Sequence, residues 1–269
     1  MTPVGSSAPA APPLQRLDER GAQRGFANLL RKELATWTRT RSGWVQLLLW
    51  LAILNGLMTL PLVFMRDMFA GEMGSPLAAA MDMFFNLGAL APYAGVVIMT
   101  HGAIIAERQL GTAAWVLSKP VARSAFILAK FVAFGLALVV LALALPGVVA
   151  YGALSLEAGA WLDAPRFAAG VGMLALGLLW YLAVTLMLGT LTSARGVVLA
   201  VPLVLLVTGD MLIMLWPTVA ELGPWVLGRM AMLVADGGPL LSPWPLLSTA
   251  FGTVAFLAIA LWRFEREEF

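Results

Sequence analysis

Few side chains in this sequence of 269 residues are of the types that perform chemistry. The absence of cysteine and the presence of one histidine exclude thiol nucleophiles, thiolate metal sites and clusters of histidine ligands. Asp210 is the one carboxylate inside a predicted membrane span, where an ionisable group is costly unless it is paired or hydrated. Asp210 is therefore a candidate for binding substrate or protons, with structural hydrogen bonding inside a helix bundle or exposure at the outer interface as the alternatives.

The same scarcity limits the enzymes that the chain could be. An intramembrane serine protease needs a serine and a histidine within reach, and an aspartyl protease needs two carboxylates. His101 lies near the cytoplasmic end of a predicted span whereas Ser75 is external, and Asp210 has no second carboxylate beside it. An intramembrane enzyme stays open as an alternative, as does a non-catalytic membrane scaffold.

One polar segment between two apolar stretches carries the richest pattern. It is residues 107–123, which read ERQLGTAAWVLSKPVAR. Gly111 can end one helix, Thr112 can cap the next and Pro120 can stop it. We expect a short helix that begins at Thr112, lies across the membrane face and presents Trp115 and Leu117 to lipid or to a protein partner.

The elements that position these residues are predicted to be membrane-spanning helices. Hydrophobic residues make up 61% of the chain and charged residues 12%, against about 45–50% and about 25% in soluble domains. The mean hydropathy is +0.88. The sequence predicts an all-α polytopic membrane protein with six spans of roughly 20 residues each. The predicted spans are Trp44–Met65, Phe84–Ile105, Phe131–Leu154, Phe167–Leu191, Gly196–Leu215 and Pro245–Trp262.

The distribution of basic residues predicts the orientation of the spans. Of the 17 lysines and arginines, only Arg66, Arg166 and Arg229 fall on one side of the predicted topology. Basic residues are enriched on the cytoplasmic side of membrane proteins, so we expect both termini in the cytoplasm. No secretory signal is expected, because the first long apolar run begins only at Trp44.

The segment before the first span divides into two parts. Residues 1–25 are rich in proline, alanine and serine and are predicted to form a disordered cytoplasmic tail. In residues 26–43, apolar side chains recur at helical spacing, while Arg31, Lys32 and Glu33 face elsewhere. This pattern predicts an amphipathic helix in the membrane interface, with a soluble extension of the first span as the alternative.

The polar segment resembles that of the ABC-2 type permeases, the membrane subunits of type V ABC exporters. Gln109 and Ala129 depart from the family pattern, since a second acid and a glycine are usual at these positions. The residues that match are Glu107, Arg108, Gly111, Thr112, Leu117, Pro120, Arg123 and Lys130.

The resemblance covers residues 26–269 and includes two further segments. The stretch with Arg31, Lys32 and Glu33 resembles the elbow helix that precedes the first span in that family. Residues 217–244 are similar to its external re-entrant helices. The family also has six spans and both termini in the cytoplasm.

The resemblance implies a permease subunit of an ATP-driven exporter in a plasma membrane or a bacterial inner membrane. A second copy, or a similar permease, would complete the substrate pathway among the membrane lipids. ATP and Mg²⁺ would bind to separate ABC ATPase subunits, because this chain has no phosphate-binding motif G-x-x-x-x-G-K-[ST]. No cofactor, metal or nucleic acid is expected to bind this chain. Residues 106–130 would form the coupling-helix loop, with ATPase-coupling roles for Glu107, Gly111, Thr112, Trp115, Leu117, Pro120 and Arg123.

Overall fold

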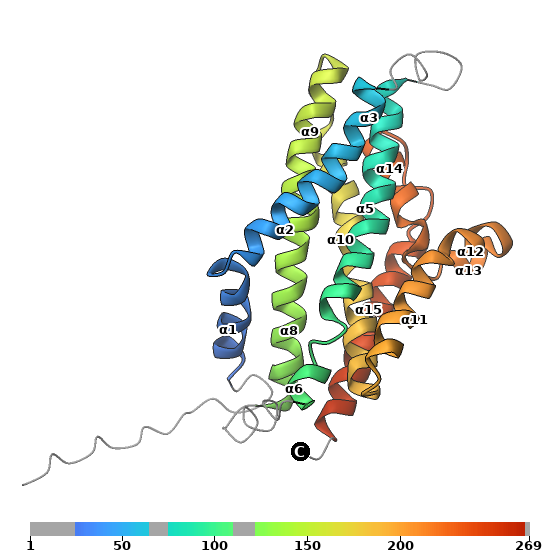
Figure 1. The fold of residues 1–269 in the computed structure, drawn as a ribbon. Coiled ribbons are helices and arrows are strands. Elements are labelled where there is room, and N and C mark those ends of the chain that lie inside the picture. Colours follow the sequence, from blue (N-terminus) through green and yellow to red (C-terminus); the bar gives the residue numbers. More distant parts are fainter. Residues whose placement is uncertain (1–24, 65–74, 110–121, 267–269) are drawn as a thin grey trace, which may run out of the picture.

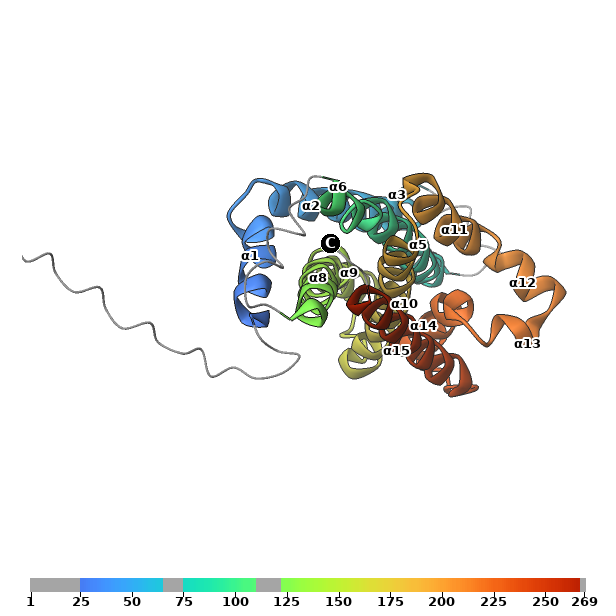
Figure 2. The ribbon, with the colours of Figure 1, turned by 90° about the horizontal axis from the view of Figure 1, so that it is seen from below.

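The computed structural model of the chain describes residues 25–64, 75–109 and 122–266. Every regular element in these ranges is a helix, as the composition predicts. The helices stand side by side, and α10 lies at the centre of the bundle (Figures 1 and 2). In chain order they are α1 (Phe26–Thr38), α2 (Ser42–Trp50), η1 (Leu51–Gly56), α3 (Leu57–Val63), α5 (Pro76–Thr100), α6 (Ile105–Gln109), α8 (Arg123–Leu138), η2 (Val139–Ala144), α9 (Leu145–Ala158), α10 (Ala164–Leu191), α11 (Arg195–Val207), α12 (Gly209–Leu215), α13 (Pro217–Ala220), η3 (Pro224–Val226), α14 (Leu227–Ala235) and α15 (Trp244–Glu265).

Five helical stretches in the described part are long and apolar enough to cross a membrane. They make the chain a multi-pass membrane protein. The stretches are Ser42–Val63, Pro76–Glu107, Arg123–Ala158, Ala164–Leu191 and Trp244–Glu265. All five contain a predicted span or most of one, and several extend beyond it because the helix continues into its polar flanks.

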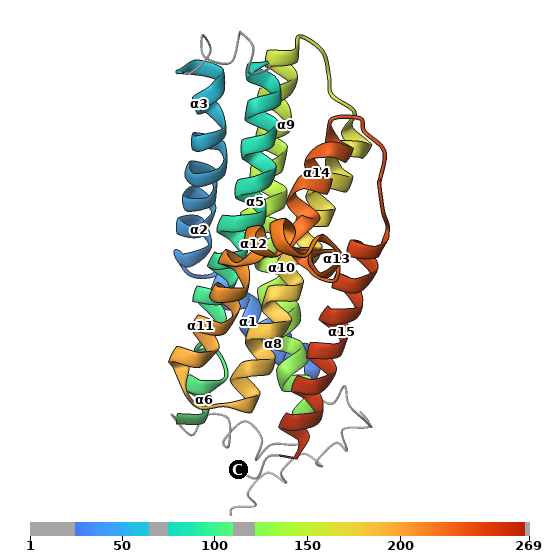
Figure 3. The ribbon, with the colours of Figure 1, turned by 90° about the vertical axis from the view of Figure 1, so that its right-hand side faces the viewer.

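The fifth predicted span, Gly196–Leu215, is not one continuous helix. Its first part, α11, has 13 residues and is about 20 Å long, short of the ~30 Å of hydrocarbon in a bilayer. The chain turns at Thr208, and α12 and α13 then project sideways from the bundle (Figures 1 and 3). The prediction of one straight span here is therefore wrong.

A tryptophan from a later segment accounts for this break. Trp225 Nε1 donates a hydrogen bond of 2.7 Å to the carbonyl oxygen of Leu205 near the end of α11. A Cβ atom at Gly209 would overlap the Trp225 ring, so the glycine allows the indole to reach the backbone. The hydroxyl of Thr208 donates to the carbonyl oxygen of Val204 at 2.8 Å. The carbonyl oxygen of Leu205, near the end of α11, thus receives a side-chain donor.

Two spans each contain a short π-helical segment. The segments are η1 in the first span and η2 in the third, and they lie in neighbouring helices because α2 packs against η2 and η1 against α9. Pro146 accounts for η2, since its ring would clash with the carbonyl of Ala142 four residues earlier in a regular α-helix. The widened turn avoids this clash while the helix continues for 36 residues, about 54 Å.

Capping residues fix where two of the long helices begin. The Ser75 hydroxyl accepts from the backbone N–H of Ala78 at 3.1 Å, and Pro76 is the first residue of α5. The Asp163 carboxylate accepts from the backbone N–H of Arg166 at 3.0 Å at the start of α10. Both helices thus start with a side chain that satisfies an unpaired backbone donor.

The amphipathic segment before the first span is helical, but its extent differs from the prediction. Instead of one helix through residue 43, α1 ends at Thr38 and α2 begins at Ser42. Helix α1 lies beside the lower end of α8 (Figure 1). Leu29 is its buried residue, and the Trp37 ring meets Phe134 of α8 edge to face at 5.8 Å. Packing against another helix, rather than apolar composition alone, therefore fixes α1.

Candidate functional site

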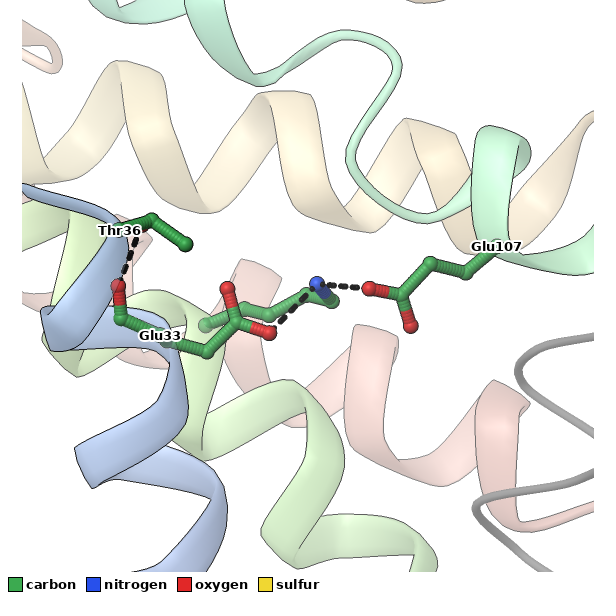
Figure 4. A network of polar contacts seen from close by, with 4 residues as sticks. Glu33, Thr36 and Glu107 are labelled. Atoms are coloured by element: carbon green, nitrogen blue, oxygen red, sulfur yellow. Dashed lines mark hydrogen bonds and ion pairs between the residues drawn. The ribbon is translucent and has the colours of Figure 1, made fainter. Parts of the chain in front are cut away.

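A buried lysine at the lower end of the bundle joins three separate segments of the chain. Lys130 lies in the second turn of α8 and is only 3% exposed. Its Nζ atom donates to Glu107 Oε1 of α6 at 2.7 Å and to Glu33 Oε1 of α1 at 3.1 Å. Figure 4 shows Glu33 and Glu107 reaching toward this nitrogen from opposite sides. We call these three side chains the lysine cluster.

The burial of these charges makes the lysine cluster sensitive to the loss of any member. The exposed fractions of the Glu33 and Glu107 side chains are 14% and 21%. A buried ammonium group without a partner is strongly unfavourable, and two carboxylates compensate for it here. The three segments are therefore held together by charges that have little access to solvent.

Aromatic contacts extend the lysine cluster to the last helix. Lys130 Nζ lies 5.1 Å from the centre of the Phe126 ring, close enough for a cation–π interaction. The Phe126 ring stacks on Phe264 of α15, with centroids 5.3 Å apart. Helix α15 is thus linked to the same end of α8 as α1 and α6.

Two further hydrogen bonds flank the segment that connects α6 to α8. Arg195 Nη2 at the start of α11 donates to Gln109 Oε1 at 2.7 Å. Arg123 Nη1 at the start of α8 donates to the carbonyl oxygen of Glu265 at 2.9 Å. The last residue of α6 and the first residue of α8 are each bonded to another helix at this end of the bundle.

The sequence model of one protein family matches residues 45–269. The chain belongs to the DUF2705 family, which is described as proteins of unknown function. No curated protein matches the chain. Two members of the lysine cluster, Glu107 and Lys130, lie within the DUF2705 region, and Glu33 precedes it.

Part of the predicted coupling segment of this DUF2705 protein is found in the lysine cluster or beside it. Glu107 belongs to the cluster, and Arg123 lies near it at the start of α8. Residues 123–130, which were predicted to belong to the coupling loop, are instead the first turns of α8. The other predicted coupling residues lie outside the described part of the chain. They are Gly111, Thr112, Trp115, Leu117 and Pro120.

The remaining predicted site residues do not gather at this point. Arg31 and Lys32 are exposed on α1. Of the predicted elbow residues, Glu33 is the one that belongs to the lysine cluster. Asp210 lies in α12, outside the five candidate spans, and its side chain is outside the described part. Asp82 lies inside the candidate span Pro76–Glu107, which corrects the prediction that Asp210 is the one carboxylate in a span.

Sequence reasoning missed the central role of Lys130. Its signal is a lysine within the apolar run FILAKFVAF at 126–134, where burial demands a partner. Gln109 departs from the pattern of the resembled family, and it accepts a hydrogen bond from Arg195. Among the described residues, no group of three or more histidine or acidic side chains is arranged to hold a metal ion.

Proposed function

We propose that this DUF2705 protein is the permease subunit of an ATP-driven exporter of the ABC-2 type. Two such subunits, identical or similar, form the substrate pathway, and separate ATPase subunits bind ATP and Mg²⁺. The resemblance of residues 107–123 and of the Glu33 segment motivates this proposal. The observation that supports it most is the lysine cluster, since it joins both resembling segments through one buried side chain.

In the proposed topology both termini are cytoplasmic, and the lysine cluster lies near the cytoplasmic face. The distribution of lysine and arginine supports this orientation. Helix α1 acts as the elbow helix, and the fifth crossing begins with α11. The segment with α13 and α14 takes the place of the external re-entrant helices, and α15 makes the sixth crossing.

The lysine cluster gives a physical route for coupling. Residues 112–117, which resemble the coupling segment of the ABC-2 type permeases, dock on the ATPase, and closure of the ATPase pair displaces them. Because Glu107 precedes this segment and Lys130 follows it, a displacement acts on the second and third spans and on α1 together. Coupling requires that these contacts differ in free energy between the inward-open and outward-open states.

The test is purification of the tagged protein from its native membrane in mild detergent, with mass spectrometry and an ATPase assay. We expect a P-loop ATPase in stoichiometric amount. Trp115→Asp and Leu117→Asp are expected to abolish its association while membrane insertion is retained. The matched control is Trp161→Asp at the opposite end of the bundle, where the indole is 79% exposed. A chain that purifies without an ATPase would contradict the proposal and favour a scaffold.

A further inference from the structure

A cavity in the half of the bundle opposite the lysine cluster has the features of a ligand site. Its volume is about 940 Å³, near the upper end of the range for small-molecule pockets. It follows one face of α5 and is also lined by residues of α3, α10, α11, α12, η3 and α14. Helices α3, α10, α11 and α14 pack against α5, and Figure 3 shows α3 and α14 at the height of the upper part of α5.

The mouth of the cavity carries one acidic and one basic side chain. Asp82 of α5 and Arg229 of α14 both line the cavity, and both are exposed. Asn86 Nδ2 donates to Asp82 Oδ1 at 2.7 Å and to the Asp82 carbonyl oxygen at 3.0 Å, which fixes the position of the carboxylate. A carboxylate and a guanidinium on facing helices complement a group that carries both charges.

Below these charges the walls of the cavity are apolar. Leu87, Leu90, Leu206 and Met232 line it, from α5, α11 and α14. Leu90 is 49% exposed and belongs to a candidate membrane span, so this level of the lining is accessible from outside the chain. An apolar chain can enter from the membrane without crossing a polar barrier.

Two tyrosine rings form the floor. The Tyr93 and Tyr181 rings are 5.2 Å apart, and each side chain is at most 1% exposed. A Cβ atom at Gly177 would overlap the Tyr93 hydroxyl, so this hydroxyl is held against α10 and the ring forms the cavity surface. The cavity therefore ends at two aromatic rings that are almost fully buried.

The part of the cavity between Asp82 and Tyr93 matches one leaflet of a bilayer. Asp82 and Tyr93 are eleven residues apart on α5, which is about 16 Å at 1.5 Å per residue. Half of the ~30 Å hydrocarbon core is about 15 Å. A lipid with its head at Asp82 and Arg229 would reach the tyrosine rings with the end of its chain.

We propose that this cavity binds one molecule of a zwitterionic phospholipid. The ammonium group pairs with Asp82, the phosphate pairs with Arg229, and one acyl chain lies along α5 down to Tyr93. The site is built from a single chain, so its occupancy requires neither a second permease nor an ATPase. A failure of this proposal is therefore distinguishable from a failure of the proposed transport function.

Native mass spectrometry of the delipidated full chain tests this proposal. The probes are phosphatidylethanolamine, phosphatidylglycerol and diacylglycerol with identical acyl chains, and glycerophosphoethanolamine as the head alone. We expect one phosphatidylethanolamine per chain, bound about tenfold more tightly than the other two lipids because both charges of its head are paired. Asp82→Asn and Arg229→Gln should each remove most of this preference. Asp236→Asn and Arg263→Gln, exposed residues that do not line the cavity, are the matched controls and should retain it.

A variant that fills the cavity tests the site independently of charge. Ala79→Phe places a ring among the lining residues and should abolish binding, with thermal unfolding confirming that the chain is folded. Three outcomes would each overturn the proposal. They are equal affinity for the three lipids, competition by the free head as strong as that of the whole lipid, and unchanged binding in folded Ala79→Phe. If Ala79→Phe does not fold, the lipid preference of the charge variants still decides.

Discussion

Replacement of Lys130 by methionine tests whether the lysine cluster holds the lower end of the bundle together. Methionine keeps much of the length of the side chain but removes the ammonium group. The two glutamate oxygens lie within 3.1 Å of Lys130 Nζ, so they are at most about 6 Å apart. At an effective dielectric constant of ~20, two carboxylates at this separation repel by about 3 kcal/mol.

The expected loss of stability follows from this repulsion and from the burial of the cluster. Removing one partner of a buried ion pair costs about 3–5 kcal/mol, and we expect Lys130→Met to lower the free energy of unfolding by this amount. The assay is unfolding in mixed detergent and SDS micelles, followed by tryptophan fluorescence. Trp37, one of the ten tryptophans that contribute to this signal, lies at the contact between α1 and α8.

A triple variant separates electrostatics from packing. Lys130→Met combined with Glu33→Gln and Glu107→Gln removes all three charges, and replacing a whole buried ion cluster is often close to neutral. We expect the triple variant to recover most of the lost stability, to within about 1–2 kcal/mol of the unmodified chain. An unchanged stability in Lys130→Met, or a triple variant as unstable as the single one, would refute the reasoning.

Two other predictions concern close contacts in the bundle. Gly177→Ala should lower the free energy of unfolding by about 1–3 kcal/mol because the new methyl group overlaps the Tyr93 hydroxyl, and adding Tyr93→Phe should restore part of it. No recovery in the double variant, measured by the same SDS titration, would show that this overlap is not the cause. Trp225→Phe should cost about 1–2 kcal/mol by removing the donor to Leu205, and the exposed Trp161→Phe serves as its control. Equal losses in these two variants would contradict the role given to the indole N–H.

Composition alone predicted the long central helices because their apolar length is a local property. The predicted span Phe167–Leu191 is contained in α10 and ends at the same residue. The fifth span failed because residues around Gly209 are as apolar as those of a span, and what divides them is Trp225, which lies sixteen residues farther along the chain. Hydropathy does not detect a break that a tertiary contact stabilises.

The sequence likewise predicts part of the candidate site and not the rest. Lys130 within an apolar run indicates that a partner must exist, but its partners lie 97 and 23 residues away in the sequence. Which acids approach it depends on how α1 and α6 pack against α8. The cavity at Asp82 was missed because the second span was predicted to begin at Phe84, which left this carboxylate in a loop.

The π-helical segment η2 sets the rotational relation between the two halves of the third span. One residue more or less in a helix turns every following side chain by about 100° around the axis. The part of the span that carries Lys130 and the part that begins at Leu145 therefore face directions that a uniform α-helix could not combine. Loss of a single residue from η2 would leave the apolar composition of the span unchanged and would turn Lys130 away from Glu33 and Glu107 if the upper half kept its packing. For this span, the number of residues between its two ends is thus as much a constraint as their hydrophobicity.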